Sequence, residues 1–191
     1  MPELRPYRTR EDMTQWFRDP AIVPFIEEEL KRGVYRGIGE FHLNGAEATT
    51  PIVKRIADLA AERNLPLHAH SDEMAIEALF AANPRVTVLW AHAGMSTPVE
   101  TLGRMIERYP NLWVELSYRY DIVQDGKLDP AWRALFERFP DRFVYGTDTW
   151  TESRWEQLPA LATTARGWLA ELPAEIAVKI ASRNFQTLYG Q

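Results

Sequence analysis

The chain has 191 residues and a net charge of −5, and 46% of its residues are hydrophobic and 26% charged. This length fits one domain, which we place over residues 1–191. The absence of cysteine excludes disulfides, thiolate zinc sites and cysteine nucleophiles. The negative charge argues against nucleic acid or an anionic membrane as a partner, and no apolar run approaches the ~18 residues of a membrane span. The N-terminus has no apolar signal-peptide core, so we expect a cytoplasmic protein unless an upstream segment has been lost.

Residues 1–32 are predicted as a helical lead-in without a strand, from the segments "TREDMTQWF" and "VPFIEEELKRG". From residue 33 to 191, short apolar runs alternate with amphipathic segments. The runs are rich in β-branched or aromatic residues and are bounded by Gly, Pro or Asn, as buried strands are. They are "YRGIGEFHL" (35–43), "LPLHAH" (65–70), "RVTVLWAH" (85–92), "NLWVELS" (111–117) and "RFVYGTD" (142–148).

Three of the helices between these runs have readable starts. Thr50, Thr97 and Asp129 are predicted N-caps, each followed by proline at the first helical position, and Glu100 would complete a capping box with Thr97. Two further helical segments, the first around 152–170, close the chain. Strand–helix alternation with short loops predicts an α/β fold of about five parallel βα units behind the N-terminal helices.

Polar residues stand at the end of every predicted strand. In a parallel α/β sheet the chemistry collects where the carboxyl ends of the strands open into loops. The residues at these ends are Glu40 and His42, His68 and His70, His92, Glu115 and Ser117, and Asp148, and they include all four histidines of the chain. Imidazole and carboxylate are ligands that zinc and similar divalent ions prefer.

Each of these residues also has a structural interpretation. A single strand-end histidine is more often hydrogen-bonded than metal-bound, Glu115 could pair with Arg119, and Asp148 could cap the following helix. Independent structural roles do not predict that all of them converge on one rim. The whole set therefore indicates a metal site.

The ordered motifs resemble the metal-dependent amidohydrolase superfamily, in particular its amidohydrolase-2 branch. "GIGEFHL", "LPLHAHSD", "WAHAG" and "FVYGTD" are similar to the fourth, fifth, sixth and eighth strands of that family's (β/α)8 TIM barrel, over roughly residues 33–190. The resemblance implies a partial barrel with His70, His92 and Asp148 as metal ligands, and Glu40 beside the metal or its water. It implies Asp148 as the general base and places His70, not His68, at the ligand position.

One departure concerns the family's first strand, which supplies a His-x-His pair. No histidine precedes Glu40 in this chain, and too few residues follow His68 for that pair to begin a barrel. An arc of five strands leaves an open edge and an apolar inner face. The N-terminal helices, a second copy in a homo-oligomer, or a longer natural protein would cover it, and we favour the last.

The resemblance implies a metal-dependent hydrolase acting on a C–N or C–O bond of a small molecule, with a metal-activated water. The cofactor would be a divalent metal ion, zinc first, although the same ligands serve manganese and iron. A non-oxidative decarboxylase on the same scaffold is one alternative. The other is a catalytically inactive half-barrel with a role in assembly.

Four further residues are predicted near the mouth of the site as substrate-binding residues. Arg119 in "SYRYD" would clamp a carboxylate through both guanidinium nitrogens, and Trp150 would wall an aromatic pocket. His42 and His68 complete this group. Ordinary packing is an equally good interpretation of Trp150.

Overall fold

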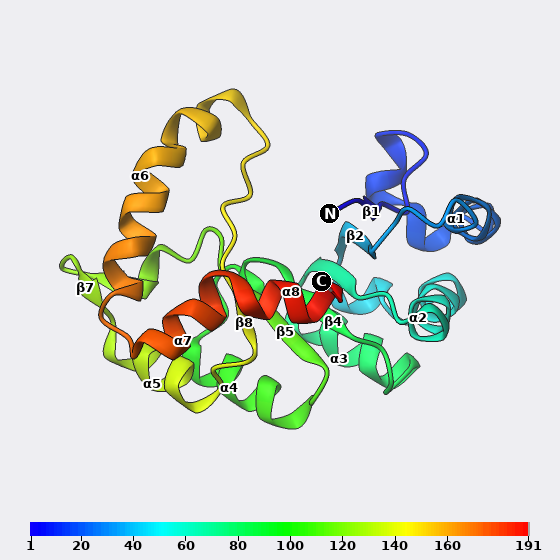
Figure 1. Cartoon of the computed structure of the whole chain (residues 1–191). Coiled ribbons are helices and arrows are strands. Elements are labelled where there is room, and N and C mark those ends of the chain that lie inside the picture. Colours follow the sequence, from blue (N-terminus) through cyan, green and yellow to red (C-terminus); the bar gives the residue numbers. More distant parts are fainter. Residues whose placement is uncertain (191) are drawn as a thin grey trace.

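The computed structural model describes residues 1–190 and contains an open parallel sheet (Figure 1). Its strand order is β1-β2-β3-β4-β5-β8, and a separate antiparallel hairpin joins β6 and β7. The strands of the sheet are β1 (Glu3–Leu4), β2 (Gly37–Leu43), β3 (Leu67–Ser71), β4 (Val88–Trp90), β5 (Leu112–Glu115) and β8 (Phe143–Val144); the hairpin strands are β6 (Val123–Gln124) and β7 (Lys127–Leu128). The prediction of an α/β partial TIM barrel is confirmed.

The prediction that residues 1–32 contain no strand is wrong. Glu3 and Leu4 form β1, which pairs in parallel with Gly37 and Ile38 of β2. Two residues are too few to show the alternation by which a strand is recognised in sequence. The sheet therefore has six parallel strands, and the lead-in supplies one of its edges.

Helices follow each of the longer strands. They are α1 (Ile22–Leu30), α2 (Pro51–Arg63), α3 (Glu73–Ala82), α4 (Val99–Arg108), α5 (Pro130–Arg138), α6 (Glu152–Leu169), α7 (Ala174–Val178) and α8 (Asn184–Tyr189). The segment "TREDMTQWF" forms two short 3-10 turns, Glu11–Thr14 and Trp16–Arg18, instead of a continuous helix. Within residues 1–190, no helix combines the length and apolarity needed to cross a bilayer.

Two of the three predicted N-caps are confirmed. The Thr50 hydroxyl accepts from a backbone N–H in the first turn of α2, and the Asp129 carboxylate accepts from two N–H groups of α5. The third cap, at Thr97, is wrong, because its hydroxyl donates to the Gly94 carbonyl at 3.2 Å and α4 begins only at Val99. The Thr97 hydroxyl is hydrogen-bonded within the loop before α4 and therefore does not cap the helix.

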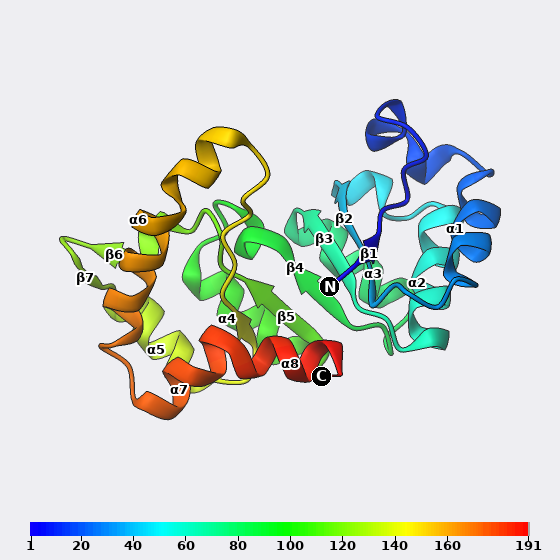
Figure 2. The same ribbon diagram turned by 45° about the horizontal axis from the view of Figure 1, so that its top comes forward.

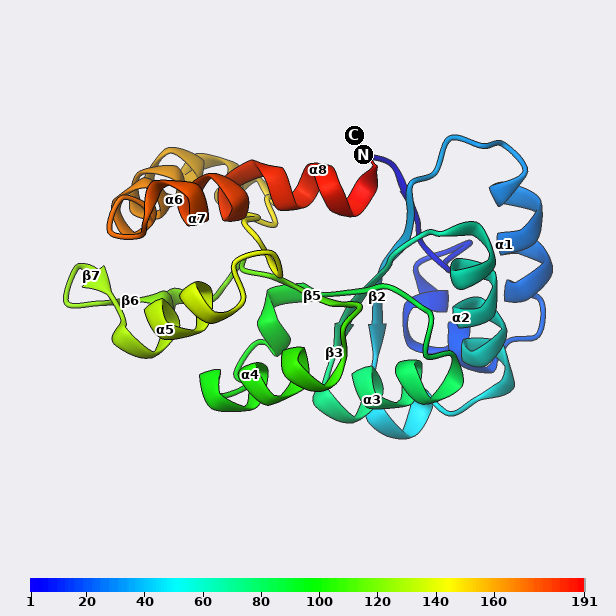
Figure 3. The same cartoon turned by 60° about the horizontal axis from the view of Figure 1, so that its bottom comes forward.

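The two faces of the sheet have different covers. The main core contains residues of the sheet and of α1 to α6, and its largest fully buried side chains include Trp16, Phe41, Trp90 and Trp132. On the opposite face, Tyr189 of α8 packs with residues of β4 and β8 in a smaller apolar cluster. Figure 3 shows the strands between α8 on one side and α3 and α4 on the other.

The first strand, β1, and the last helix, α8, lie close together (Figures 1 and 2). The Tyr189 hydroxyl donates to Glu3 Oε1 at 2.6 Å, so the last helix is bonded to the first strand. This contact joins residues 186 positions apart in the chain.

Candidate metal centre

Three predicted site residues meet beside neighbouring strands, Glu40 from the middle of β2, His70 from near the end of β3 and His92 from just after β4. Glu40, His70 and His92 each present one ligand atom, and these atoms lie within 4.8 Å of one another. His70 Nδ1 and His92 Nε2 are both 3.2 Å from Glu40 Oε1. One carboxylate oxygen thus stands between two imidazole nitrogens, which is a donor set suited to a divalent ion.

A bulge in β2 aims Glu40 at this cluster. Gly39 pairs with His68 and Phe41 with Ala69, so Glu40 is the extra residue between two registers of the ladder. Such bulges re-aim side chains beside active sites. A Cβ atom at Gly39 would lie 2.5 Å from the His68 Cβ, so only glycine fits at the start of the bulge.

His92 is held in position from the side opposite Glu40. Its Nδ1 lies 2.6 Å from Ser117 Oγ and 3.2 Å from Glu115 Oε2, and its backbone N–H donates to Glu115 Oε2 at 3.0 Å. His92 has a φ of 55° and Ala93 a φ of 47°, a left-handed conformation that costs free energy outside glycine. Buried contacts with Glu115 and Ser117 offset that cost and leave Nε2 directed at the cluster.

The cluster has a strongly negative character. Burial by itself would raise the pKa of Glu40, but hydrogen bonds with His70 and His92 outweigh it and hold the pKa well below its usual range. Burial opposes the charged form of His92, yet contacts with Glu115 and Glu40 raise its pKa to about 9. The carboxylates therefore stabilise positive charge at this point, and this is what a bound cation requires.

Asp148 lies beside the cluster, in the loop after β8. Its Oδ2 is 3.9 Å from His92 Nε2, outside hydrogen-bond distance. Burial and the neighbouring Glu40 raise the pKa of Asp148, while His92 opposes them. The structure thus places Asp148 as a fourth group next to the three that converge most closely.

The two other histidines lie at different depths. The His42 ring is exposed at the rim, and its centre is 4.4 Å from that of His70. The Tyr7 hydroxyl accepts the backbone N–H of His42 at 2.8 Å. His68 lies deeper, where its Nδ1 is 2.9 Å from Glu3 Oε2.

The structure does not bring Arg119 or Trp150 to the cluster. The Arg119 guanidinium is buried and donates to both carboxylate oxygens of Asp121 and to the carbonyls of Ala93 and Thr97. These partners occupy it, so a substrate clamp at this residue has no support in the geometry. Trp150 is 73% exposed.

Two polar residues near the site were not singled out from the sequence. Tyr7 comes from the lead-in, where no strand was expected, and Arg154 lies in the first turn of α6. Arg154 packs over the Tyr118 ring, which contacts the His92 ring in turn. No spacing rule marks an arginine six positions after a strand-end aspartate, so only the tertiary structure identifies it.

The sheet and the residues at its strand ends define a partial TIM barrel with a candidate metal centre. The chain belongs to the amidohydrolase family, whose model matches residues 21–191. A search of curated proteins found no match to the chain.

Solved structures with the same fold are distant in sequence. An amidohydrolase from Burkholderia multivorans is 15% identical with a TM-score of 0.66, covering 91% of this chain and 71% of its own. A second structure of it, with bound zinc, gives 15% identity, a TM-score of 0.60, and coverage of 91% and 70%. An uncharacterized TIM-barrel protein from Bordetella bronchiseptica is 15% identical with a TM-score of 0.61, covering 89% of this chain. The present chain spans 62% of the length of that protein.

Proposed function

We propose that this chain forms the catalytic part of a metal-dependent hydrolase that acts on a C–N or C–O bond of a small molecule. The observation that carries the proposal is the convergence of Glu40, His70 and His92 from three neighbouring strands and the residues that follow them, with Asp148 beside them. Membership of the amidohydrolase family and the zinc in the Burkholderia structure also support a metal-dependent hydrolase. Zinc is the first candidate ion, and manganese or iron would suit the same donors.

His70, His92 and Asp148 are the proposed ligands, with Glu40 between the two imidazoles. A divalent ion in such a site lowers the pKa of water and polarises a substrate carbonyl. Asp148 would then accept a proton and return it to the leaving group, since burial raises its pKa above that of an ordinary aspartate. Glu115 and Ser117 would fix the tautomer of His92 so that Nε2 is free for the ion.

The first test is metal content per chain, measured by plasma mass spectrometry on protein purified without a histidine tag. We expect about one equivalent of divalent metal. His70→Ala should lose it, whereas Asp125→Asn, which changes an exposed hairpin carboxylate, should keep it. Metal-free protein that stays metal-free after dialysis against zinc and manganese would refute the proposal.

A second test separates hydrolysis from the decarboxylation that the same scaffold would permit. Metal-loaded protein is screened against lactones and N-acyl compounds with an acid-release readout, and against aromatic acids with a carbon dioxide readout. We expect acid release that is abolished in Asp148→Asn. Carbon dioxide release without acid release would overturn the hydrolase assignment.

The open sheet favours a second role, in assembly. Its two edges, β1 and β8, are the ends of the strand order, and pairing between copies would complete the arc. Light scattering tests this proposal directly. A dimer or larger oligomer is expected, and a stable monomer at high concentration would exclude self-completion.

A further inference from the structure

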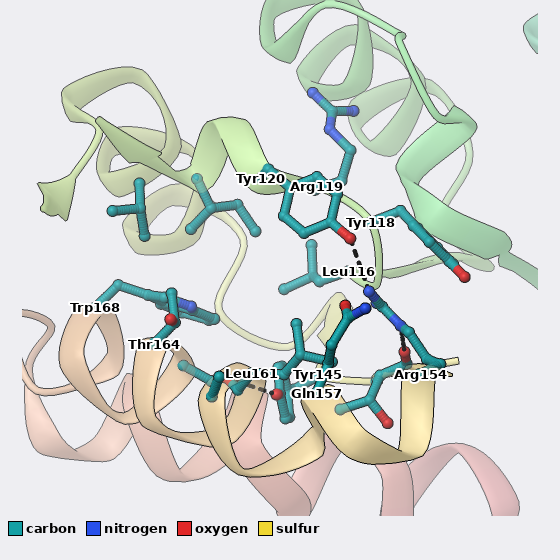
Figure 4. A pocket seen from close by; sticks show the side chains of 16 residues that line it. Leu116, Tyr118, Arg119, Tyr120, Tyr145, Arg154, Gln157, Leu161, Thr164 and Trp168 are labelled. Carbon is teal, nitrogen blue, oxygen red and sulfur yellow. Dashed lines mark hydrogen bonds between the residues drawn. The ribbon is translucent and has the colours of Figure 1, made fainter. Parts of the chain in front are cut away.

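A cavity of about 220 Å³ lies beside the candidate metal centre, between α6 and the loop that follows β5 (Figure 4). Its walls are mainly apolar or aromatic and include Leu116, Tyr145, Leu161 and Trp168. Polar side chains at one end include Arg154 and Gln157. The volume is below that of a drug-sized site and suits a ligand the size of a single ring with one substituent.

Arg154 is one of two arginines that line this cavity, and it is only 5% exposed. Its Nε donates to the Thr147 carbonyl at 2.9 Å and its Nη1 to the Tyr120 hydroxyl at 2.7 Å. The guanidinium also lies over the Tyr118 ring, 4.1 Å from the centroid. All three of these partners are uncharged. Within residues 1–190 no carboxylate forms an ion pair with Arg154, and the charge of Asp148 acts on it only through space.

A buried charge without a counter-charge is unfavourable unless another group compensates it. Arg119, which also lines the cavity, shows the usual solution, because Asp121 accepts two hydrogen bonds from its guanidinium. In Figure 4 the Arg119 side chain extends away from the centre of the cavity, whereas Arg154 lies at its edge. The two arginines therefore differ in whether their charge is already paired.

The cavity adjoins the metal centre through shared residues. The Tyr118 ring makes an edge contact with His92 on one side, with centroids 5.4 Å apart, and packs on Arg154 on the other. Thr147, which accepts from Arg154, directly precedes Asp148 in the chain. A ligand bound at Arg154 would therefore lie close to the proposed reacting groups, with the Tyr118 ring between Arg154 and His92.

We propose that this cavity is a carboxylate-recognition subsite, in which Arg154 pairs with the carboxylate of a small acid and the acid's apolar, ring-sized body packs against Leu161 and Trp168. The proposal deepens the hydrolase assignment and rests on it for the statement that the bound acid is a substrate or product. The planar guanidinium matches a carboxylate in a two-point contact. The substrate class is then a small organic acid that carries a ring and a second, hydrolysable group.

Calorimetric titration with benzoate, and with benzamide as its uncharged counterpart, tests the subsite. The full chain is titrated both metal-loaded and after treatment with a chelator. We expect benzoate to bind at least tenfold more tightly than benzamide. Arg154→Gln should weaken benzoate binding at least tenfold, while Arg166→Gln, an exposed arginine on the same helix, should leave it unchanged. Equal affinity for the two probes would overturn the proposal, as would benzoate binding that survives in folded Arg154→Gln.

A second variant keeps the test decisive if Arg154→Gln fails to fold. Leu161→Trp fills the apolar end of the cavity without touching the arginine, so it should abolish benzoate binding, and unchanged binding would overturn the proposal. Metal content is measured on the same samples. Benzoate binding to a chain that takes up no metal would refute the hydrolase assignment and leave the subsite intact. Metal uptake without benzoate binding would refute the subsite and leave the hydrolase assignment intact.

Discussion

Glu115→Gln is expected to destabilise the fold and to weaken metal binding, although Glu115 is not a proposed ligand. The side chain is 7% exposed, and its two oxygens accept three hydrogen bonds. Oε2 accepts from the His92 backbone N–H at 3.0 Å and from Ser117 Oγ at 2.8 Å, and Oε1 accepts from the Ser117 backbone N–H at 2.6 Å. A glutamine NH₂ group in either position would face a backbone N–H that it cannot accept.

At least one buried backbone donor would therefore lose its partner. Such a loss costs about 1–3 kcal/mol. The variant also removes the carboxylate charge beside His92, so we expect a loss of unfolding free energy in the upper part of this range, about 2–3 kcal/mol. For a chain of this size, that corresponds to a fall of roughly 4–12 °C in Tm. Removing a group that orients a ligand weakens metal affinity by about 10- to 100-fold.

Urea unfolding of the metal-free protein measures the first effect, and competition with a chromophoric chelator measures the second. Glu107→Gln is the matched control, because Glu107 forms an exposed ion pair with Arg138 and its loss should cost less than about 1 kcal/mol. A Glu115→Gln variant with an unchanged urea midpoint and a metal Kd within about twofold of wild type would refute this account of His92 positioning.

Three other changes test the fold. Tyr189→Phe removes the hydroxyl bonded to Glu3, and we expect a loss of about 1–3 kcal/mol in urea unfolding; an unchanged midpoint would mean that the contact does not hold α8 in place. Asp129→Ala should cost about 1 kcal/mol as a lost N-cap, whereas Glu100→Gln should cost almost nothing, and an equal cost for both would contradict the cap assignment. Asp12→Asn should destabilise the protein at pH 7 but not at pH 1.5, because hydrogen bonds from an arginine lower the pKa of Asp12 to about 2. The contribution of the carboxylate to stability is complete above the unfolded value of 3.8 and is lost as the pH falls through about 2, so a stability difference that persists at pH 1.5 would contradict the pairing.

The sequence by itself determined the longer strands and most helix starts. Each of the five predicted apolar runs contains a strand of the sheet. The runs are six to nine residues long, so the apolar pattern is visible in the sequence even where the strand within the run is as short as β4 or β8. The caps at Thr50 and Asp129 were also local, since an N-cap needs only its own turn and the proline after it. The strand-end histidines followed from the same logic, and His70 and His92 do meet.

Tertiary structure decided what depends on partners distant in sequence. β1 exists because Glu3 and Leu4 find an edge of β2, and two residues carry no periodic signal of their own. Glu40 reaches the metal centre through a register shift that only pairing with β3 defines. The difference between Arg119 and Arg154 was likewise set by the tertiary structure. Asp121 pairs with the Arg119 guanidinium, whereas among residues 1–190 no carboxylate forms an ion pair with Arg154. Residue types and local periods could be read along the chain, but the pairing of charges is set only when the elements pack together.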